Sequence, residues 1–244
     1  MEGKQDGAIK GGDMFVHAPF FVAAAHELKS PLALVRQLSL ELASEELSAK
    51  DRKMIAEQIS LTSERALRLT TDLTKQARLE DSLFTLEPLN AVALCEEVVH
   101  ELQPLYRAKG KRLRFGSGRR TVLCLANKDL LRRILLSLTD NAVHYADNSD
   151  VVELSVQATE GGRYVRLGVR DYGPAVPRPA WKTLVNSLGR ATYPLHDRPA
   201  SSGLGMYIAT QFAAAMQGEV GAVRHQDGAT FYVEVHASHQ LRLI

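Results

Sequence analysis

Four short segments of this 244-residue sequence carry side chains that could do chemistry, and the first centres on a histidine. His26 and Glu27 lie together in the run Phe21-Val-Ala-Ala-Ala-His-Glu-Leu-Lys-Ser-Pro-Leu32. A neutral imidazole nitrogen is a competent nucleophile, and a neighbouring carboxylate can orient the ring and take up its proton. The alternative is a solvated His–Glu pair on a helix surface.

Two further segments place polar side chains at the ends of predicted elements. Asn141 comes late in a predicted helix, and an amide oxygen there could be a hard ligand for Mg²⁺ that already carries phosphate oxygens. Asp171 ends a predicted strand, and Gly173 leaves room for another group to approach the backbone. A carboxylate in that place could accept a hydrogen bond from the exocyclic amine of adenine. The alternatives are that Asn141 is an ordinary polar residue near the end of a helix, and that Asp171 is an ordinary residue where a strand leads into a turn.

The fourth segment is Ser201-Ser202-Gly203-Leu204-Gly205, directly before a predicted apolar helix. Backbone N–H groups at a helix N-terminus bind phosphate when no side chain obstructs them. The segment is not the phosphate loop that ends in Gly-Lys-Ser or Gly-Lys-Thr, because no such sequence follows it. A flexible loop that meets a helix is the alternative.

A pair of helices must position His26. The first is expected to start near Pro19, which suits a first helical turn. Its apolar stripe consists of Leu28, Leu32, Val35 and Leu42. At about 100° per residue, His26 lies nearly opposite this stripe and should face solvent. Ser48 and Asp51 form a capping box for a second helix that runs to about residue 80. One hairpin buries little, so a homodimeric four-helix bundle is predicted.

The rest of the chain is predicted to be a mixed α/β domain over residues 84–244, after a helical domain at 18–82 and a linker or disordered segment at 1–17. Helices should begin at Asn90, Asn127 and Met206. Residues 171–202 are rich in Pro, Gly, Arg and Ser and are expected to be a long loop. The predicted strands are 83–86, 113–115, 121–125, 151–158, 164–170, 220–223 and 230–235, with 113–115 and 121–125 joined by a glycine-rich turn and the last two pairs as hairpins.

Composition limits the partners and the compartment. The net charge of +2 gives no argument for binding nucleic acid or an anionic membrane. No stretch approaches 18 consecutive apolar residues, so no direct membrane insertion is expected. Cys95 and Cys124 lie in apolar patterns and are predicted to be buried, reduced thiols.

In order and spacing, the four segments resemble those of the cytoplasmic core of bacterial two-component sensor histidine kinases. The run 21–32 is similar to the family's His box, 135–145 to its Asn box, 171–174 to its first glycine box and 203–205 to its second. The resemblance covers about residues 20–240. It implies a helical hairpin that dimerises into a four-helix bundle, then a Bergerat-type α/β sandwich with helices on one face of a mixed sheet.

The resemblance also implies an activity and a cytoplasmic location, either as a soluble kinase or as the cytoplasmic part of a membrane-anchored receptor. His26 would attack the γ-phosphate of ATP and pass the phosphoryl group to an aspartate in the receiver domain of a response regulator. Glu27 and Ser30 resemble the pair used for phosphatase activity on that regulator. Asn141 would hold Mg²⁺ and Asp171 would recognise adenine. The other implied nucleotide-binding residues are His144, Tyr145, Gly173, Ser202, Gly203, Leu204 and Gly205.

Four positions depart from the family pattern. Ser30 stands where Thr or Asn is usual, and Ser137 replaces an earlier Asn of the Asn box. His144 occupies a place often taken by Lys or Arg, and Ala175 replaces a second Gly after Asp171. None of these changes removes an indispensable group, so an active enzyme is predicted. The alternatives are a catalytically degenerate dimeric scaffold and a related ATPase that does not phosphorylate histidine.

Overall fold

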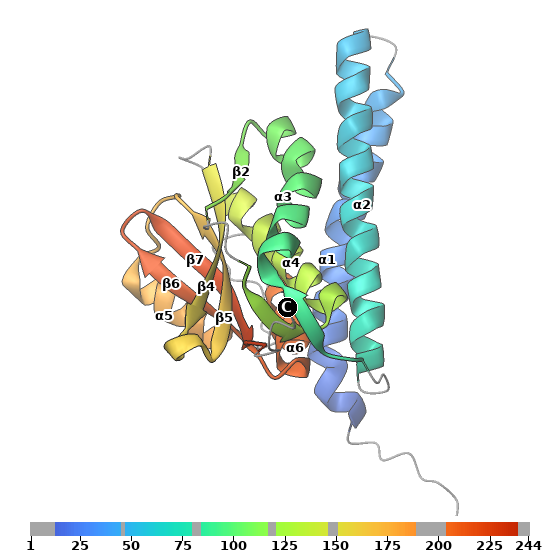
Figure 1. The fold of residues 1–244 in the computed structure, drawn as a ribbon. Helices are drawn as coiled ribbons and strands as arrows, with labels where there is room; N and C mark the ends of the chain where they lie inside the picture. The colour runs from blue at the N-terminus through green and yellow to red at the C-terminus, as the bar shows by residue number, and fades with distance from the viewer. Residues whose placement is uncertain are drawn as a thin grey trace, which may run out of the picture.

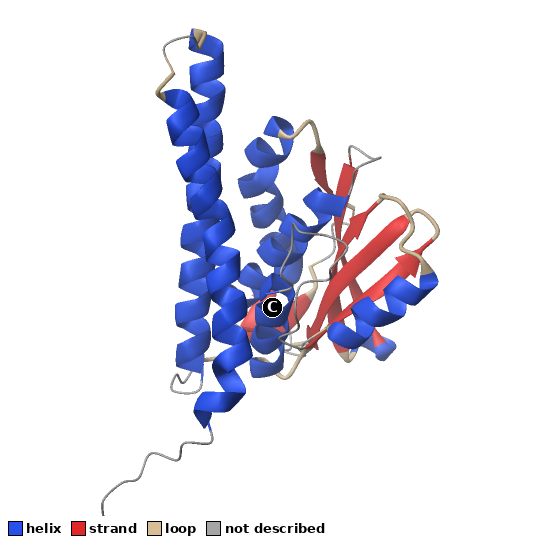
Figure 2. Ribbon diagram, turned by 180° about the vertical axis from the view of Figure 1, so that it is seen from behind, coloured by secondary structure: helices blue, strands red, loops and turns tan. Residues whose placement is uncertain are grey.

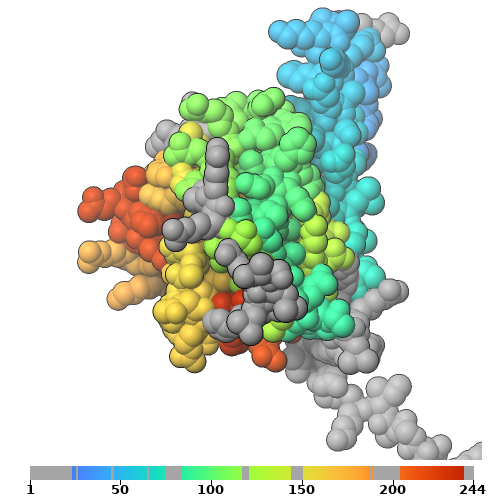
Figure 3. Space-filling view, viewed as in Figure 1, coloured from blue at the N-terminus to red at the C-terminus, as the bar shows by residue number. Residues whose placement is uncertain are grey.

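The structure is a computed structural model that describes residues 13–44, 47–79, 84–116, 121–145, 151–188 and 204–238. Its described part forms two regions, a long hairpin of two helices and an α/β region packed along one side of it (Figure 1). The space-filling view shows the end of the hairpin around residue 50 extending past the α/β region (Figure 3). None of the described helices has the length and apolar character needed to cross a membrane.

The hairpin consists of α1 (Asp13–Leu42) and α2 (Ala49–Leu79). The predicted start near Pro19 is wrong, because α1 begins six residues earlier and Pro19 lies inside it. A proline suits the first turn of a helix but need not be there, and a helix can continue through the loss of one backbone donor. The Ser48 half of the predicted capping box is confirmed, since the Asp51 N–H donates to Ser48 Oγ at 3.2 Å. The Asp51 side chain reaches back to the Ser48 hydroxyl, which donates to Asp51 Oδ2 at 2.7 Å.

Among the hairpin side chains that the structure describes, few are buried within the single chain. The buried apolar ones among them are Ala24, Leu38, Ile55 and Ala66. The predicted stripe is only partly covered, because Leu28, Val35 and Leu42 are half-buried while Leu32 remains 59% exposed. One helix of a hairpin covers only one side of its neighbour, so part of a helical stripe stays in solvent.

The α/β region contains a mixed sheet with the strand order β2-β4-β5-β7-β6. The β2–β4 pair is parallel, whereas β4–β5, β5–β7 and β6–β7 are antiparallel. Its strands are β2 (Arg112–Phe115), β4 (Val151–Thr159), β5 (Tyr164–Asp171), β6 (Glu219–His225) and β7 (Gly228–His236). A separate antiparallel ribbon pairs β1 (Glu87–Asn90) with β3 (Leu123–Ala126). The predicted hairpins β4–β5 and β6–β7 are therefore confirmed.

Three helices, α3 (Ala91–Ala108), α4 (Lys128–Tyr145) and α6 (Leu204–Ala215), lie between the sheet and the hairpin (Figure 2). The predicted cap of α3 is confirmed, because Asn90 Oδ1 accepts from the Val92 N–H at 3.1 Å. Alternate residues of the strands enter one core with these helices, and both cysteines are buried in it and free, as predicted. The mixed sheet with helices on one face is the predicted fold class.

The hairpin contacts the α/β region directly. Ala24 of α1 belongs to the buried core of the α/β region, and Leu69 and Leu73 of α2 pack against that core. An ion pair also joins the two regions, with Arg133 Nη1 of α4 lying 3.1 Å from Asp72 Oδ1 of α2. Both side chains are about four-fifths buried, so solvent screens this pair less than a surface pair.

Three sequence predictions in this region need correction. The first strand lies at β1, after the predicted 83–86, because an edge ribbon tolerates a proline and Pro88 pairs opposite Leu125. Strands β2 and β3 are present, but each pairs with a different partner instead of forming one unit around a turn. The predicted loop 171–202 contains the helix α5 (Arg178–Ser187). This helix begins at the sequence Pro177-Arg-Pro179, and a proline suits the first turn of a helix. Residues 189–202 lie outside the described chain.

Candidate functional site

Asp171, the last residue of β5, is the centre of the site. Its side chain is only 3% exposed. The carboxylate Oδ1 accepts a hydrogen bond from the Gly173 N–H at 3.2 Å and another from the Ala229 N–H at 3.3 Å. Burial raises the pKa of Asp171, and these two hydrogen bonds together with the charge of Arg170 oppose that rise. The site thus holds a desolvated carboxylate in a fixed position.

The turn between β6 and β7 closes against this carboxylate. Gly228 has a φ of +116°, and a Cβ there would lie 2.6 Å from Asp171 Oδ1 and 2.4 Å from the Asp171 carbonyl oxygen. Only glycine fits both the backbone conformation and the close approach. Sequence reasoning missed the turn as part of the site. Asp227-Gly228 between two alternating apolar runs signals a hairpin turn, but nothing local connects it to Asp171.

Helix α4 carries Asn141 on a face that meets the N-terminus of α6. Ser137 lies one helical turn before Asn141 and therefore shares its face. A Cβ on Gly205, the second residue of α6, would lie 2.9 Å from Ser137 Oγ. Gly205 thus permits the start of α6 to approach this face of α4. Leu204, the first residue of α6, is buried at 2% exposure and anchors that end of the helix.

Two predicted residues have described backbones only, and two lie outside the described chain. His144 and Tyr145 end α4, but their side chains are not among those described. Ser202 and Gly203 precede the first described residue of α6. The predicted phosphate cradle is therefore seen only through Leu204 and Gly205.

The hairpin carries the remaining three predicted residues on one stretch of α1. His26 lies in the helix as predicted, but its side chain is not among those described, so its outward orientation stays a prediction. Glu27 is half-buried and Ser30 is exposed. Ala24, two residues before His26, packs against the core of the α/β region. This part of α1 therefore lies beside the region that contains Asp171.

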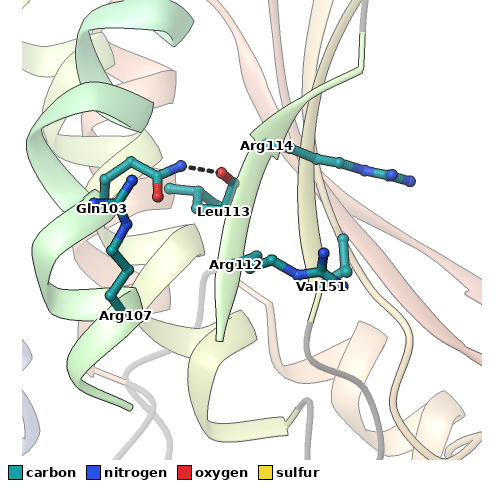
Figure 4. A pocket seen from close by; sticks show the side chains of 6 residues that line it. All are labelled: Gln103, Arg107, Arg112, Leu113, Arg114 and Val151. Carbon is teal, nitrogen blue, oxygen red and sulfur yellow. Dashed lines mark hydrogen bonds between the residues drawn. The ribbon is translucent and has the colours of Figure 1, made fainter. Parts of the chain in front are cut away.

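A cavity of about 330 Å³ lies away from these residues, between α3 and β2 (Figure 4). Arg107, Arg112 and Arg114 line it, and the Gln103 side-chain amide donates to the Leu113 carbonyl beside it. Arg112 and Arg114 extend from β2 away from Gln103 and Arg107, so the guanidinium groups do not converge on one point. None of the predicted site residues lines this cavity, and the candidate site is the Asp171 region.

Sequence comparison connects this geometry with known proteins. Residues 126–239 match the family described as "Histidine kinase-, DNA gyrase B-, and HSP90-like ATPase". The adaptive-response sensory kinase SasA of Prochlorococcus marinus is 24% identical over 214 residues, which cover 86% of this chain and 55% of that protein. The sensor protein CutS of Streptomyces coelicolor is 28% identical over 206 residues, covering 84% of this chain and 49% of that protein. The chain spans about half the length of these relatives.

Solved structures share the fold. Full-length ShkA in complex with AMPPNP superposes with a TM-score of 0.59 at 23% identity, over 93% of this chain and 46% of that chain. Histidine kinase ThkA in complex with the response regulator protein TrrA gives a TM-score of 0.63 at 15% identity, over 94% of this chain and 64% of that chain. Residues 126–239 thus match the histidine kinase, DNA gyrase B and HSP90-like ATPase family, and the chain as a whole is similar in sequence to sensor kinases and shares the fold of solved histidine kinase structures.

Proposed function

We propose that this chain is an ATP-dependent protein histidine kinase that phosphorylates His26 and passes the phosphoryl group to an aspartate of a response regulator. The observation that carries the proposal is the buried Asp171 carboxylate at the end of β5. Both of its 3.2–3.3 Å hydrogen bonds end on Oδ1, which supports Oδ2 as the acceptor for the adenine amine. Gly173 and Gly228, two of the residues beside this carboxylate, have no side chains to obstruct the base.

The phosphates would lie between α4 and the start of α6. Gly205 keeps the N-terminal turn of α6 free of a side chain where it meets α4, and N–H groups at such a turn favour anions. In the proposed site, Ser202, Gly203, Leu204, His144 and Tyr145 would complete the contacts to ATP. The ATP analogue in the ShkA structure supports this assignment.

Asn141 is the proposed protein ligand of Mg²⁺. An amide oxygen is a hard ligand, and one is enough for an ion that takes its other ligands from phosphates and water. The described residues contain no group of three His, Cys, Asp or Glu that could hold a metal by themselves, which fits such shared coordination. The ion would neutralise charge on the transferring phosphoryl group.

His26 is the proposed phosphoacceptor. Its ring nitrogen would attack the γ-phosphorus, the bond to the β–γ bridging oxygen would break, and ADP would leave. Glu27 would orient the ring and take up its proton. The phosphoryl group would then move to an aspartate of a receiver domain, and the complex of ThkA with TrrA supports a partner of that class. Glu27 and Ser30 are the proposed pair for removing phosphate from the regulator. The cytoplasm is the proposed compartment, because it fits both ATP and a response regulator as partners.

The hairpin is proposed to form a homodimer. A groove of about 680 Å³ runs along one face of α1, and its apolar lining includes Leu28, Leu32 and Leu40. Leu32 is 59% and Leu40 67% exposed within one chain. Packing a second hairpin on this face would remove both side chains from water, which favours association.

Incubation with γ-labelled ATP and Mg²⁺ tests the kinase proposal. Wild-type protein should acquire a label that is stable in base and labile in acid, as expected of phosphohistidine, and His26→Ala should acquire none. His100→Ala is the matched control, since His100 is an exposed histidine on α3. Equal labelling of the wild type and His26→Ala would refute the role of His26. Binding of ATP without labelling of the wild type would instead favour the non-catalytic scaffold.

A further inference from the structure

We propose that an ion pair between Arg170 and Asp227, on the open face of the sheet, positions the Asp171 carboxylate for recognition of the base. Neither residue belongs to the nucleotide-contacting set proposed above. The inference rests on the proposed ATP site and adds two positioning residues to it. It also predicts that the choice of base depends on a contact behind the strand that carries Asp171.

The strand register places Arg170 behind the site. Asp171 pairs with Ala229, and Arg170 pairs with Thr230 on the neighbouring strand β7. Successive side chains of a strand point to opposite faces, so Arg170 and Thr230 lie on the face away from Asp171. Asp171 and Ala229 are both buried on the helix-covered side. Apart from the effect of its charge, Arg170 therefore acts on Asp171 through the backbone and the adjoining turn.

One guanidinium group connects the two strands and the turn. Arg170 Nη1 donates to the carbonyl oxygen of Asp171 and, at 3.4 Å, to the carbonyl oxygen of Ala229. Arg170 Nη2 donates to Asp227 Oδ1 at 2.5 Å. The same group lies 4.5 Å from the centre of the Tyr172 ring, a cation–π contact. A planar guanidinium offers several donors in fixed directions, so these contacts restrain one another.

The turn that Asp227 anchors supplies a direct contact to the carboxylate. Ala229, two residues after Asp227, donates its N–H to Asp171 Oδ1 at 3.3 Å. Gly228 between them lies against the Asp171 backbone and side chain, where even a Cβ would not fit. If the turn moved away, Asp171 Oδ1 would lose the Ala229 donor, keep the Gly173 donor, and lose the wall that fixes the rotamer of the side chain. The ion pair keeps that donor in place.

Base recognition is sensitive to such positioning. An ionised carboxylate only accepts hydrogen bonds, so it matches the exocyclic amine of adenine and opposes the carbonyl oxygen that guanine carries at the same place. A site that hydrogen-bonds one group rejects an analogue lacking it because its own buried polar atom is then left unpaired. Loss of alignment should therefore weaken adenine nucleotides more than guanine nucleotides.

The strands offer a matched control four ladder positions away. Arg166 of β5 and Glu234 of β7 form a 2.8 Å ion pair on the same open face, and Arg166 lies 3.9 Å from the centre of the Tyr232 ring. That pair has the same composition, an arginine with an acid and a tyrosine, but contacts none of the residues around Asp171. Arg166→Gln thus removes an equivalent contact without touching the turn.

The experiment measures the dissociation constants of ADP and GDP with Mg²⁺ by calorimetry, together with the melting temperature, for full-chain variants. Asp227→Asn and Arg170→Gln should each weaken ADP binding about tenfold, the effect of losing one charged hydrogen bond, and leave GDP binding nearly unchanged. Asp227→Glu should retain most of the selectivity, and Arg166→Gln should retain all of it. Asp227 is 66% exposed, so Asp227→Asn should fold even if Arg170→Gln does not.

Different outcomes overturn different statements. An unchanged ratio of ADP to GDP affinity in Asp227→Asn would refute the positioning role alone. An equal loss in Arg166→Gln would show that the effect reflects general strand stability and would refute it too. Wild-type protein that binds neither nucleotide would refute the proposed ATP site, and with it the role of the ion pair.

Discussion

The two regions of the molecule differ in how completely they bury their apolar side chains. In the α/β region, Leu131, Leu135 and Val233 are fully buried. On the hairpin, Leu32, Leu40 and Leu67 are 59%, 67% and 68% exposed. Exposed large apolar side chains gathered on one element mark an interaction surface. The α/β region therefore has a complete core within one chain, and the hairpin does not.

The proposed chemistry follows the same division. Asp171 performs its proposed role from inside the α/β core, where hydrogen bonds fix a desolvated carboxylate. Ser30 and the exposed apolar residues of α1 belong to a surface that another protein can reach. A buried group suits recognition of a small ligand, whereas an accessible helix suits transfer to a second protein. Substitutions that affect one region and spare the other test this division.

The largest expected effect is in the α/β core. Leu135→Ala should lower the free energy of unfolding of this region by about 2–5 kcal/mol, because it leaves a cavity among side chains that cannot collapse fully. Leu40→Ala removes the same atoms from a mostly exposed side chain and should cost less than about 1 kcal/mol within one chain. Urea denaturation followed by near-ultraviolet circular dichroism measures both. Similar losses would contradict the difference in burial.

The second prediction concerns the exposed face of α1. Leu32→Glu combined with Leu40→Glu should raise the dissociation constant of the proposed homodimer by about 100-fold or more, since each buried unpaired charge opposes association by kcal/mol amounts. Analytical ultracentrifugation at several concentrations measures the change. Val223→Glu, on an exposed valine of β6, is the control and should leave association unchanged. A wild type that is monomeric at tens of micromolar would refute the dimer itself.

The sequence predicted those elements whose signals are local. The capping residues Ser48 and Asn90 each contact the backbone that their spacing indicated. The apolar alternation of β4 and β5 gave a hairpin in the correct place. The same local signals failed for β1, since the predicted strand 83–86 ended before Pro88 whereas an edge ribbon accepts that proline.

Contacts between distant segments could not be predicted in this way. Ala229 and Asp171 are 58 residues apart, and only the pairing of β5 with β7 brings them together. Asp171 could be identified as a site residue from the sequence, because an acidic residue directly after an apolar strand is a local signal. Arg170, Asp227 and Gly228 had no such signal, because their roles depend on the register of two strands. The parallel pairing of β2 with β4 likewise follows from the whole sheet.

The third prediction tests whether the buried acid costs the α/β region stability. Burial raises the Asp171 pKa, so near neutral pH the folded protein carries an ionised carboxylate that is less favourable than in the unfolded chain. Asp171→Asn should therefore raise the free energy of unfolding near neutral pH by about 1 kcal/mol, a usual gain at a functional site, while it weakens ATP binding.

The sign of the pH dependence provides a check on that prediction. As the pH falls through the raised pKa, the folded wild type binds a proton before the unfolded chain does, and the wild type gains stability. The advantage of Asp171→Asn should thus shrink in acid and vanish below the ordinary pKa of aspartate. Melting temperatures of both proteins across this range measure it. An advantage that grows in acid would contradict the assigned cause.

The smallest expected effect is that of the Ser48 cap on the hairpin, which is compared with the Asn90 cap of the α/β region. Asn90 Oδ1 is partly buried and accepts from two backbone donors, the N–H groups of Val92 at 3.1 Å and Ala93 at 3.4 Å. Ser48 is exposed, and water can replace its bond to the Asp51 N–H. Asn90→Ala should cost about 1–2 kcal/mol and Ser48→Ala about 0.5 kcal/mol, within the range for N-caps. Thermal unfolding, combined with amide exchange in the first turns of α2 and α3, separates the effects of the two substitutions. A larger loss of stability in Ser48→Ala than in Asn90→Ala would mean that a partner holds the turn of the hairpin.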